Sequence, residues 1–136
     1  MANIILNNKV EIIERKILSD ERGWLFKTLT GKEKGLPKST GEIYTVCGLP
    51  NQVRGGHYHK LATEWFTIIK GEATLKLKDI ANNDETIMVL NVETPLTIVV
   101  PPNVAHQFEN NSQDEFILVA YSDELYDPND TIKFDL

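Results

Sequence analysis

Short hydrophobic stretches recur about every ten residues along the chain, and polar turns or turns rich in Gly and Pro separate them. In segment 73–80, leucines alternate with lysines, which is the two-residue period of a strand with one buried face. Segment 115–122 is almost continuously apolar, which is typical of a strand in the middle of a packed sheet. By these criteria we predict strands over 9–18, 24–30, 42–49, 64–71, 73–80, 86–92, 95–102 and 115–122.

Helical periodicity is weak throughout the chain. No segment keeps a 3.6-residue apolar period for three turns, and only 122–127 has the composition of a helical turn or two. Strands at this spacing indicate a β-sandwich or a barrel. The 136 residues contain no linker, repeat or low-complexity tract, so we predict one all-β domain over 1–136.

The charge of the chain narrows the choice of partners. A net charge of −6 and a pI of about 5.0 argue against nucleic acid or an anionic membrane, although a local pocket of Arg or Lys still allows a small anionic ligand. The single cysteine, Cys47, lies in an apolar run and favours a reducing compartment. No signal peptide and no membrane-spanning apolar run are visible, so we expect a cytoplasmic protein.

All three histidines of the chain lie in two short segments. His57 and His59 alternate on an extended segment, so both imidazoles point to one face, about 7 Å apart along the strand. Glu64 begins the next strand, and His106 follows a Pro-Pro-Asn turn much later. If the two hairpins face each other inside a barrel, the four side chains converge. Such a set suits Zn, Fe, Mn, Ni or Cu.

These two segments resemble the two motifs of the cupin superfamily. The first motif, HxH-x4-E-x6-G, is matched by His57, His59, Glu64 and Gly71. The second, P-x-G-x2-H-x3-N, is matched by Pro101, His106 and Asn110, with Asn103 where Gly is usual. Asn also tolerates the left-handed turn, so this departure is mild. The resemblance implies a double-stranded β-helix, or jelly-roll barrel, a fold that hosts many chemistries.

Further segments resemble the nucleotide-sugar branch of the cupins, over about residues 10 to 134. VRGGHYHK and SDERGWLFK resemble segments shared by dTDP-4-dehydrorhamnose 3,5-epimerases and dTDP-4-keto-6-deoxyglucose 3,4-ketoisomerases. The ending, VAYSDELYDPNDTIKF, resembles the tail of the ketoisomerases and the cupin half of a capsule-synthesis reductase. The resemblance implies isomerisation of a dTDP-linked 4-keto-6-deoxyhexose to its 3-keto isomer through an enediolate, in the biosynthesis of unusual sugars for surface polysaccharides such as O-antigen.

The resemblance also implies roles for single residues in that reaction. His57 corresponds to the catalytic base, and His is the natural base near neutral pH. His59 is the expected second proton carrier or oxyanion partner. The phenol of Tyr44 can donate to the oxyanion or relay a proton, although core packing is an equally open role for it. His106 completes the polar pocket.

Binding residues follow by the same comparison. Arg54 is the best candidate for the diphosphate, through bidentate charge-assisted contacts. By analogy with the epimerases, Arg22 binds phosphate across a homodimer, and Trp24 stacks near the base. Lys27 and Lys60 are candidate helpers, and Tyr121 is a candidate for lining the pocket.

The presence of a metal is left open by the spacing. A metal-bound imidazole is a poor base because its lone pair is already donated, so we favour a metal-free reaction without a cofactor. If a divalent metal is bound, its ligands are His57, His59, Glu64 and His106. The alternatives are a 3,5-epimerase, a metal-dependent cupin (a sugar epimerase or a dioxygenase) and a non-catalytic sugar-binding cupin. The nucleotide and the product configuration at C4, galacto or gluco, are not determined by the sequence.

Overall fold

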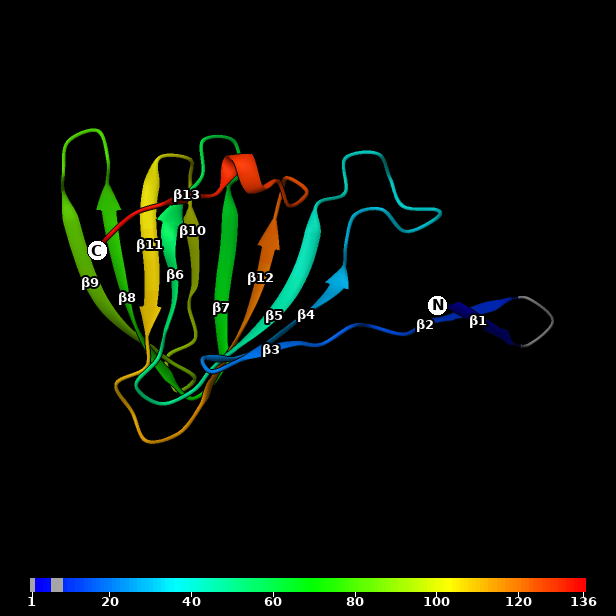
Figure 1. The fold of residues 1–136 in the computed structure, drawn as a ribbon, viewed down its shortest axis with the longest axis horizontal. Helices are drawn as coiled ribbons and strands as arrows, with labels where there is room; N and C mark the ends of the chain where they lie inside the picture. The colour runs from blue at the N-terminus through cyan, green and yellow to red at the C-terminus, as the bar shows by residue number, and fades with distance from the viewer. Residues whose placement is uncertain (1, 6–8) are drawn as a thin grey trace.

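The computed structural model describes residues 2–5 and 9–136, and its regular structure is almost entirely antiparallel β-strand (Figure 1). The strands are β1 (Ala2–Ile5), β2 (Val10–Ile13), β3 (Leu18–Asp20), β4 (Gly23–Leu29), β5 (Glu42–Gly48), β6 (Val53–Tyr58), β7 (Glu64–Lys70), β8 (Glu72–Asp79), β9 (Glu85–Asn91), β10 (Thr97–Val100), β11 (Val104–Glu109), β12 (Phe116–Ser122) and β13 (Ile132–Lys133). One 3₁₀ turn, η1 (Pro128–Asp130), precedes β13.

Two sheets form the body of the molecule. One has the strand order β10-β7-β12-β5-β4-β3, and the other has the order β13-β6-β11-β8-β9. The apolar core lies between them and is built from alternate inward-facing residues such as Phe66, Leu75, Phe108 and Leu118. The hairpin of β1 and β2 pairs only with itself among the sheets and stands apart from the body (Figure 1). The expected all-β jelly roll is therefore confirmed.

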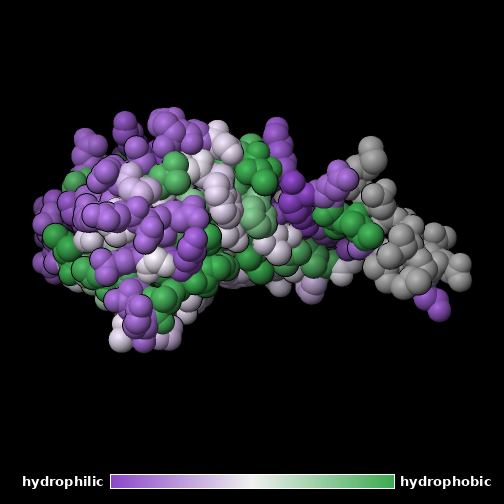
Figure 2. All heavy atoms as spheres, turned by 90° about the horizontal axis from the view of Figure 1, so that it is seen from below, coloured by the Kyte–Doolittle hydropathy of each residue, from purple (hydrophilic) through white to green (hydrophobic). Residues whose placement is uncertain are grey.

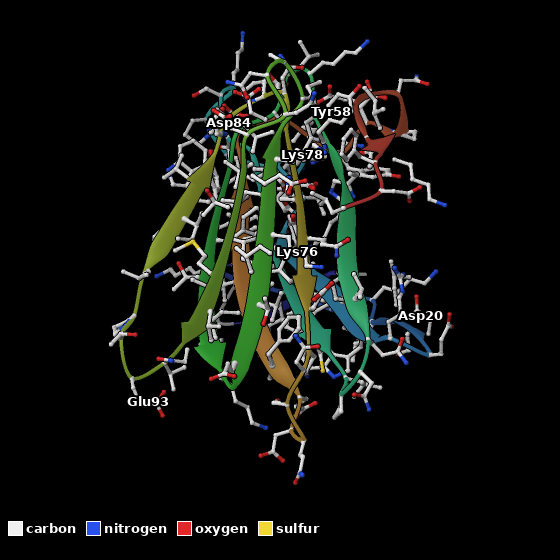
Figure 3. The ribbon with its side chains drawn as sticks, turned by 90° about the vertical axis from the view of Figure 1, so that its left-hand side faces the viewer. Asp20, Tyr58, Lys76, Lys78, Asp84 and Glu93 are labelled. Atoms are coloured by element: carbon white, nitrogen blue, oxygen red, sulfur yellow. The ribbon has the colours of Figure 1, made fainter. Side chains whose placement is uncertain are left out.

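The outer face of β8 carries lysines at the positions that the alternation predicts. Lys76 pairs with Glu109 at 2.9 Å and Lys78 with Glu85 at 3.1 Å. Leu75, which precedes Lys76 on β8, points to the opposite face and is fully buried. Figure 3 shows both lysines on this face of β8. Seen from below, hydrophilic side chains dominate the end of the molecule that carries β8 and β9, with hydrophobic ones between them (Figure 2).

Several local predictions differ from the structure. Segment 9–18 contains two short strands, β2 and the start of β3, separated by irregular chain, and the strands β1, β6, β11 and β13 were not predicted as such. The helical turn expected over 122–127 is wrong. Asp127 is extended (φ −134°, ψ 114°) because the following Pro128 disfavours helical geometry, and the 3₁₀ turn begins only at that proline.

Two turns behave as the motif comparison requires. Gly71 has φ 76° and Asn103 has φ 65°, so both adopt the left-handed conformation. Asn103 thus replaces glycine in the second motif without changing the turn. Among the described residues, no helix is long and apolar enough to cross a membrane.

Candidate functional site

The four predicted side chains meet in the interior of the barrel. His57 near the end of β6 is the direct cross-strand partner of His106 on β11, and His59 follows β6 immediately. Glu64 enters from β7 in the opposite sheet. One ligand atom from each of the four side chains lies within 4.8 Å of the other three. The four side chains converge as predicted. The two histidine segments do not face each other across the barrel, however: His57 and His106 lie on neighbouring strands of one sheet, and only Glu64 comes from the opposite sheet.

A bulge in the pairing of β6 with β11 lies beside this cluster of side chains. The register shifts between His106, which pairs with His57, and Gln107, which pairs with Gly55, so the intervening Gly56 has no partner on β11. Gly55 has φ 89°, and a Cβ atom there would lie 2.9 Å from the carbonyl oxygen of His106. Glycine therefore permits both the left-handed backbone and the close approach of the two strands that carry the histidines.

The hydrogen bonds of two imidazoles fix which nitrogen carries the proton. Nδ1 of His59 lies 2.7 Å from the carbonyl oxygen of Asp130, and Nδ1 of His106 lies 3.1 Å from that of Val104. A carbonyl only accepts hydrogen bonds, so each Nδ1 donates and each Nε2 of a neutral ring presents a lone pair.

Both lone pairs point toward a carboxylate. Oε1 of Glu64 lies 2.8 Å from Nε2 of His59 and 3.4 Å from Nε2 of His106. All three atoms are buried, and none has a hydrogen-bond partner of good geometry among the residues that the structure describes. Three converging acceptors are costly in a buried site unless a positive charge lies between them, either a proton or a metal ion.

The same donor set fits a divalent metal. Two imidazoles and a carboxylate leave further coordination positions, and His57 stands beside them as a fourth candidate. The Nδ1–H bonds of His59 and His106 to backbone carbonyls are the outer contacts that usually orient metal-binding histidines. The residues present therefore fit a metal ion. A proton shared between an imidazole and the Glu64 carboxylate would occupy the same atoms.

The environment separates the acid–base properties of the neighbouring histidines. Burial, followed by the electrostatic effect of the neighbouring imidazoles, lowers the pKa of His57 to about 4. Burial also lowers the pKa of His59, but the close carboxylate of Glu64 outweighs it and raises that pKa above its ordinary value. The rings of these two residues lie 4.9 Å apart. His57 is therefore a neutral imidazole next to one that favours its protonated form.

Tyr44 and Glu64 form the other side of this cluster. The Tyr44 hydroxyl donates to Oε2 of Glu64 at 2.5 Å. Burial and the charge of Glu64 raise the pKa of Tyr44 well above its usual range. Burial raises the pKa of Glu64, but the close imidazoles of His106 and His59 and the hydrogen bond from Tyr44 outweigh it and lower that pKa. Tyr44 is thus a neutral donor whose proton is held by Glu64, a relay position.

Two cavities meet at this cluster. The larger, of about 580 Å³, opens between the barrel and the C-terminal tail, and the smaller, of about 190 Å³, lies deeper, beside Phe66 and Phe108. Both are lined by Arg22, Leu25, Tyr44 and His57. His57 and Tyr44 therefore stand at the junction, within reach of a molecule in either cavity.

Two arginines lie at the smaller cavity. Arg54 donates from Nη1 to the carbonyl oxygen of Cys47 at 3.1 Å. Arg22 pairs with Asp20 at 2.6 Å on the surface side. Burial and the nearby charge of Arg22 lower the pKa of Arg54, and within the described residues no carboxylate oxygen lies within 4.0 Å of its guanidinium. The arrangement leaves positive charge for an anion at the cavity.

Three expected binding residues lie elsewhere in the chain. Trp24 stacks on Phe26 with ring centroids 5.7 Å apart and does not line either cavity, because its neighbours on β4, Leu25 and Lys27, take the inward positions. Tyr121 packs against Trp65 on the outer face of the six-stranded sheet, because its neighbours on β12 face the core. The Lys60 side chain is exposed outside both cavities. Trp24, Tyr121 and Lys60 therefore line neither cavity of a single chain, and their predicted contacts with a ligand stay predictions.

Lys27, a candidate helper in the sequence, lies inside the site, whereas Asp130 is a site residue to which the sequence assigned no role. Lys27 pairs with Glu42 at 2.9 Å inside the larger cavity and lies over the ring of Tyr126, 5.1 Å from its centroid. Asp130 is buried beside His59. Asp130 lies in the YDPND segment of the tail that resembles the ketoisomerases, and this resemblance was the sequence feature that could have identified it.

Known proteins resemble this chain in sequence or in fold. A UDP-2-acetamido-2,6-beta-L-arabino-hexul-4-ose reductase of Pseudomonas aeruginosa is 28% identical over 109 residues, which are 80% of this chain and 28% of the reductase. The capsular polysaccharide assembling protein CapF of Staphylococcus aureus superposes with a TM-score of 0.81 at 16% identity, over 92% of this chain and 34% of CapF. A double mutant of the 3,4-ketoisomerase QdtA of Thermoanaerobacterium thermosaccharolyticum, in complex with TDP, superposes with a TM-score of 0.59 at 25% identity, over 88% of this chain and 83% of QdtA.

A jelly roll that gathers two motif histidines, a glutamate and a third histidine inside the barrel defines a cupin. The model of one family, the polysaccharide biosynthesis C-terminal domain, matches residues 18–134. The chain therefore belongs to that family. It spans only about a third of the length of the reductase and of CapF.

Proposed function

We propose that the protein is a nucleotide-sugar isomerase that converts a dTDP-linked 4-keto-6-deoxyhexose into its 3-keto isomer. The observation that carries this proposal is the placement of His57 at the junction of two cavities, beside His59 and with Tyr44 lining the same cavities. A neutral imidazole can remove a proton from carbon, and its neighbours can return one.

The substrate and the product are isomers, so the reaction only moves protons and the electron pairs of the bonds that they leave. His57 takes the proton from C3 of the 4-keto sugar, and the electrons of that bond form an enediolate whose charge lies on the C4 oxygen. A proton is then delivered to C4, the C3 hydroxyl gives up its proton as its carbon becomes the ketone, and the C4 oxygen becomes a hydroxyl. His59 or the Tyr44–Glu64 pair supplies and recovers protons, because these groups share one hydrogen-bonded cluster.

The arginines support a nucleotide diphosphate as the handle of the substrate. Arg54 has no carboxylate partner in the described chain, and Arg22 lines both cavities. A diphosphate between them would relieve the repulsion of two guanidinium groups. QdtA, with its bound TDP, supports the choice of nucleotide.

The assay follows hydrogen at single carbon atoms. The protein is incubated with dTDP-4-keto-6-deoxyglucose in deuterated water, and the product is examined by proton and carbon NMR. We expect deuterium at C4 and the ketone at C3. No exchange at C3 or C4 with this substrate would overturn the proposal, and no turnover of any keto sugar, with ligand binding retained in His57→Asn, would favour a sugar-binding module.

A second candidate is a metal-dependent epimerase for a nucleotide-linked keto sugar. The observation that favours it is the convergence of three buried acceptor atoms, on His59, Glu64 and His106, that lack hydrogen-bond partners within the described residues. Those residues would hold the metal, which when bound supplies Lewis-acid stabilisation of the sugar oxyanion. His57 would remain free to move the proton at the neighbouring carbon.

The same incubation separates the two candidates. Epimerisation places deuterium next to a ketone that stays at C4, whereas isomerisation moves the ketone. Metal analysis of protein purified without a His-tag, and activity before and after chelation, then tests the metal. Activity that survives complete removal of metal contradicts the second candidate.

A further inference from the structure

The C-terminal tail is tied to the segment that carries His59 by one buried carboxylate. Asp130, 7% exposed, accepts three backbone N–H groups: those of Lys60 and Leu61 at Oδ1, at 2.8 and 3.0 Å, and that of Ala62 at Oδ2, at 3.2 Å. Three charge-assisted bonds to consecutive amides hold the β6–β7 connection in one conformation.

The main chain of the same residue holds the imidazole. The carbonyl oxygen of Asp130 accepts the Nδ1–H of His59 at 2.7 Å, which turns Nε2 toward Glu64 at 2.8 Å. The side chain of Asp130 thus fixes where the segment after His59 lies, and its carbonyl fixes how the ring is turned. The two contacts depend on each other because they leave from one residue.

The two histidines that face Glu64 are oriented in different ways. His106 bonds to Val104, two residues earlier on its own strand, so its ring is set locally. His59 bonds to a residue 71 positions away, on the turn η1. Only the His59 ring therefore depends on how the C-terminal tail docks.

We propose that Asp130 is a positioning residue of the reaction, which acts by holding His59 in the orientation that presents Nε2 to Glu64. This inference rests on the proposed function for its catalytic meaning, but the orientation itself is independent of which reaction the protein catalyses. It gives the YDPND tail a role in the site: the tail locks a histidine of the first motif.

The test uses the complete chain, labelled with ¹⁵N-histidine, and the variants Asp130→Asn and Asp130→Ala. The Nδ1–H proton of His59 is buried in a short hydrogen bond, so in the unaltered protein we expect a protected imidazole resonance that exchanges slowly with water. Asp130→Asn retains an acceptor for two of the three amides but places an NH₂ group opposite the third, so protection falls about 10-fold; Asp130→Ala loses the resonance. Turnover falls by about 10- to 100-fold in the same order.

The matched control is Asp123→Asn. Asp123 is an exposed carboxylate on the same tail that accepts the backbone N–H of Thr63 at 2.9 Å, and it has no contact with His59. This variant keeps the protected resonance and the rate. Amide spectra of each variant establish that the barrel is folded, and Asp130→Asn decides the question if Asp130→Ala does not fold.

The outcomes separate this inference from the proposed function. Full protection of the His59 Nδ1–H in folded Asp130→Asn overturns the positioning role, even if the rate falls. Loss of protection in a protein that never exchanges deuterium into a keto sugar leaves the positioning role intact and rejects the isomerase.

Discussion

At the scale of single residues, the site depends on different protonation of two neighbouring imidazoles. Burial keeps His57 neutral, whereas His59 faces a carboxylate that stabilises its charged form. Environments that push the pKa values of adjacent groups apart are a usual way to build an acid and a base from one residue type. Tyr44 stays protonated beside Glu64 and extends this cluster.

Replacing the base tests this division. In His57→Asn, we expect the rate of deuterium exchange into the sugar to fall by about 10²- to 10⁴-fold, because the general base is removed. TDP binding, measured by calorimetry, should stay within about twofold, because the arginines are unchanged. A variant that exchanges deuterium at the original rate contradicts the assignment of His57 as the base.

At the scale of elements, the bulge between β6 and β11 brings the histidine-bearing strands together. Gly55 has a left-handed backbone, and the carbonyl of His106 occupies the space where a side chain would begin. The position therefore links backbone geometry directly to the site.

We expect Gly55→Ala to lower the free energy of unfolding by about 1–2 kcal/mol, because the left-handed conformation disfavours Cβ. The rate should fall as well, because the new Cβ displaces the His106 strand. Denaturant unfolding measures the first effect. Gly35→Ala is the matched control for backbone strain: its φ is 83°, but a Cβ there has open space and lies far from the site in sequence. Equal loss of activity in both variants would argue against a local effect at the bulge.

A loop between β4 and β5 offers an independent test of electrostatics. Glu33 accepts the backbone N–H and hydroxyl of Thr30 and pairs with Arg15 at 2.9 Å. Burial raises the pKa of Glu33, but these hydrogen bonds and the nearby Arg15 outweigh it and lower the pKa to about 2. Its contribution to stability is therefore full above the unfolded value of 4.5 and is lost as pH falls toward 2.

The variant Glu33→Gln should lower stability by about 1 kcal/mol at pH 7, after allowance for screening by solvent. The difference from the unaltered protein should shrink between pH 4.5 and pH 2, because the carboxylate is then protonated. Denaturant midpoints at pH 7, 4 and 2.5 measure this. A difference that is constant with pH would show that charge on Glu33 is not the cause.

At the scale of the whole molecule, the sandwich provides two connected cavities with the reactive groups at their junction and the arginines on one side. A ligand that binds only the folded state stabilises it, by about 2.7 kcal/mol at 100 times its dissociation constant. If the cavity arginines bind a nucleotide diphosphate, its addition should raise the melting temperature of the protein measurably.

We expect TDP to raise the melting temperature, and Arg54→Gln to weaken TDP binding by about 10-fold or more through loss of a charge-assisted contact. UDP tested in parallel decides between the two nucleotides. Lys38→Gln, on an exposed loop outside both cavities, serves as the control for general charge. Equal shifts in the Arg54→Gln and unaltered proteins would place the diphosphate elsewhere.

The homodimer also belongs to this scale and stays a prediction. The edge strand β10 carries Val99 with 52% of its surface exposed, and edge strands gain from pairing. Sedimentation equilibrium should give twice the chain mass of 15.4 kDa. A monomer mass at micromolar concentration would contradict it.

The sequence by itself determined the strands with clear alternation, the left-handed turn at Asn103 and the convergence of His57, His59, Glu64 and His106. These depend on local periodicity and on motif spacing, which one sequence displays. The tertiary structure alone decided that Trp24 and Tyr121 face away from the cavities, because the face of a strand depends on which neighbour is buried. It also decided the role of Asp130, because a contact between residues 59 and 130 joins segments that no local pattern relates.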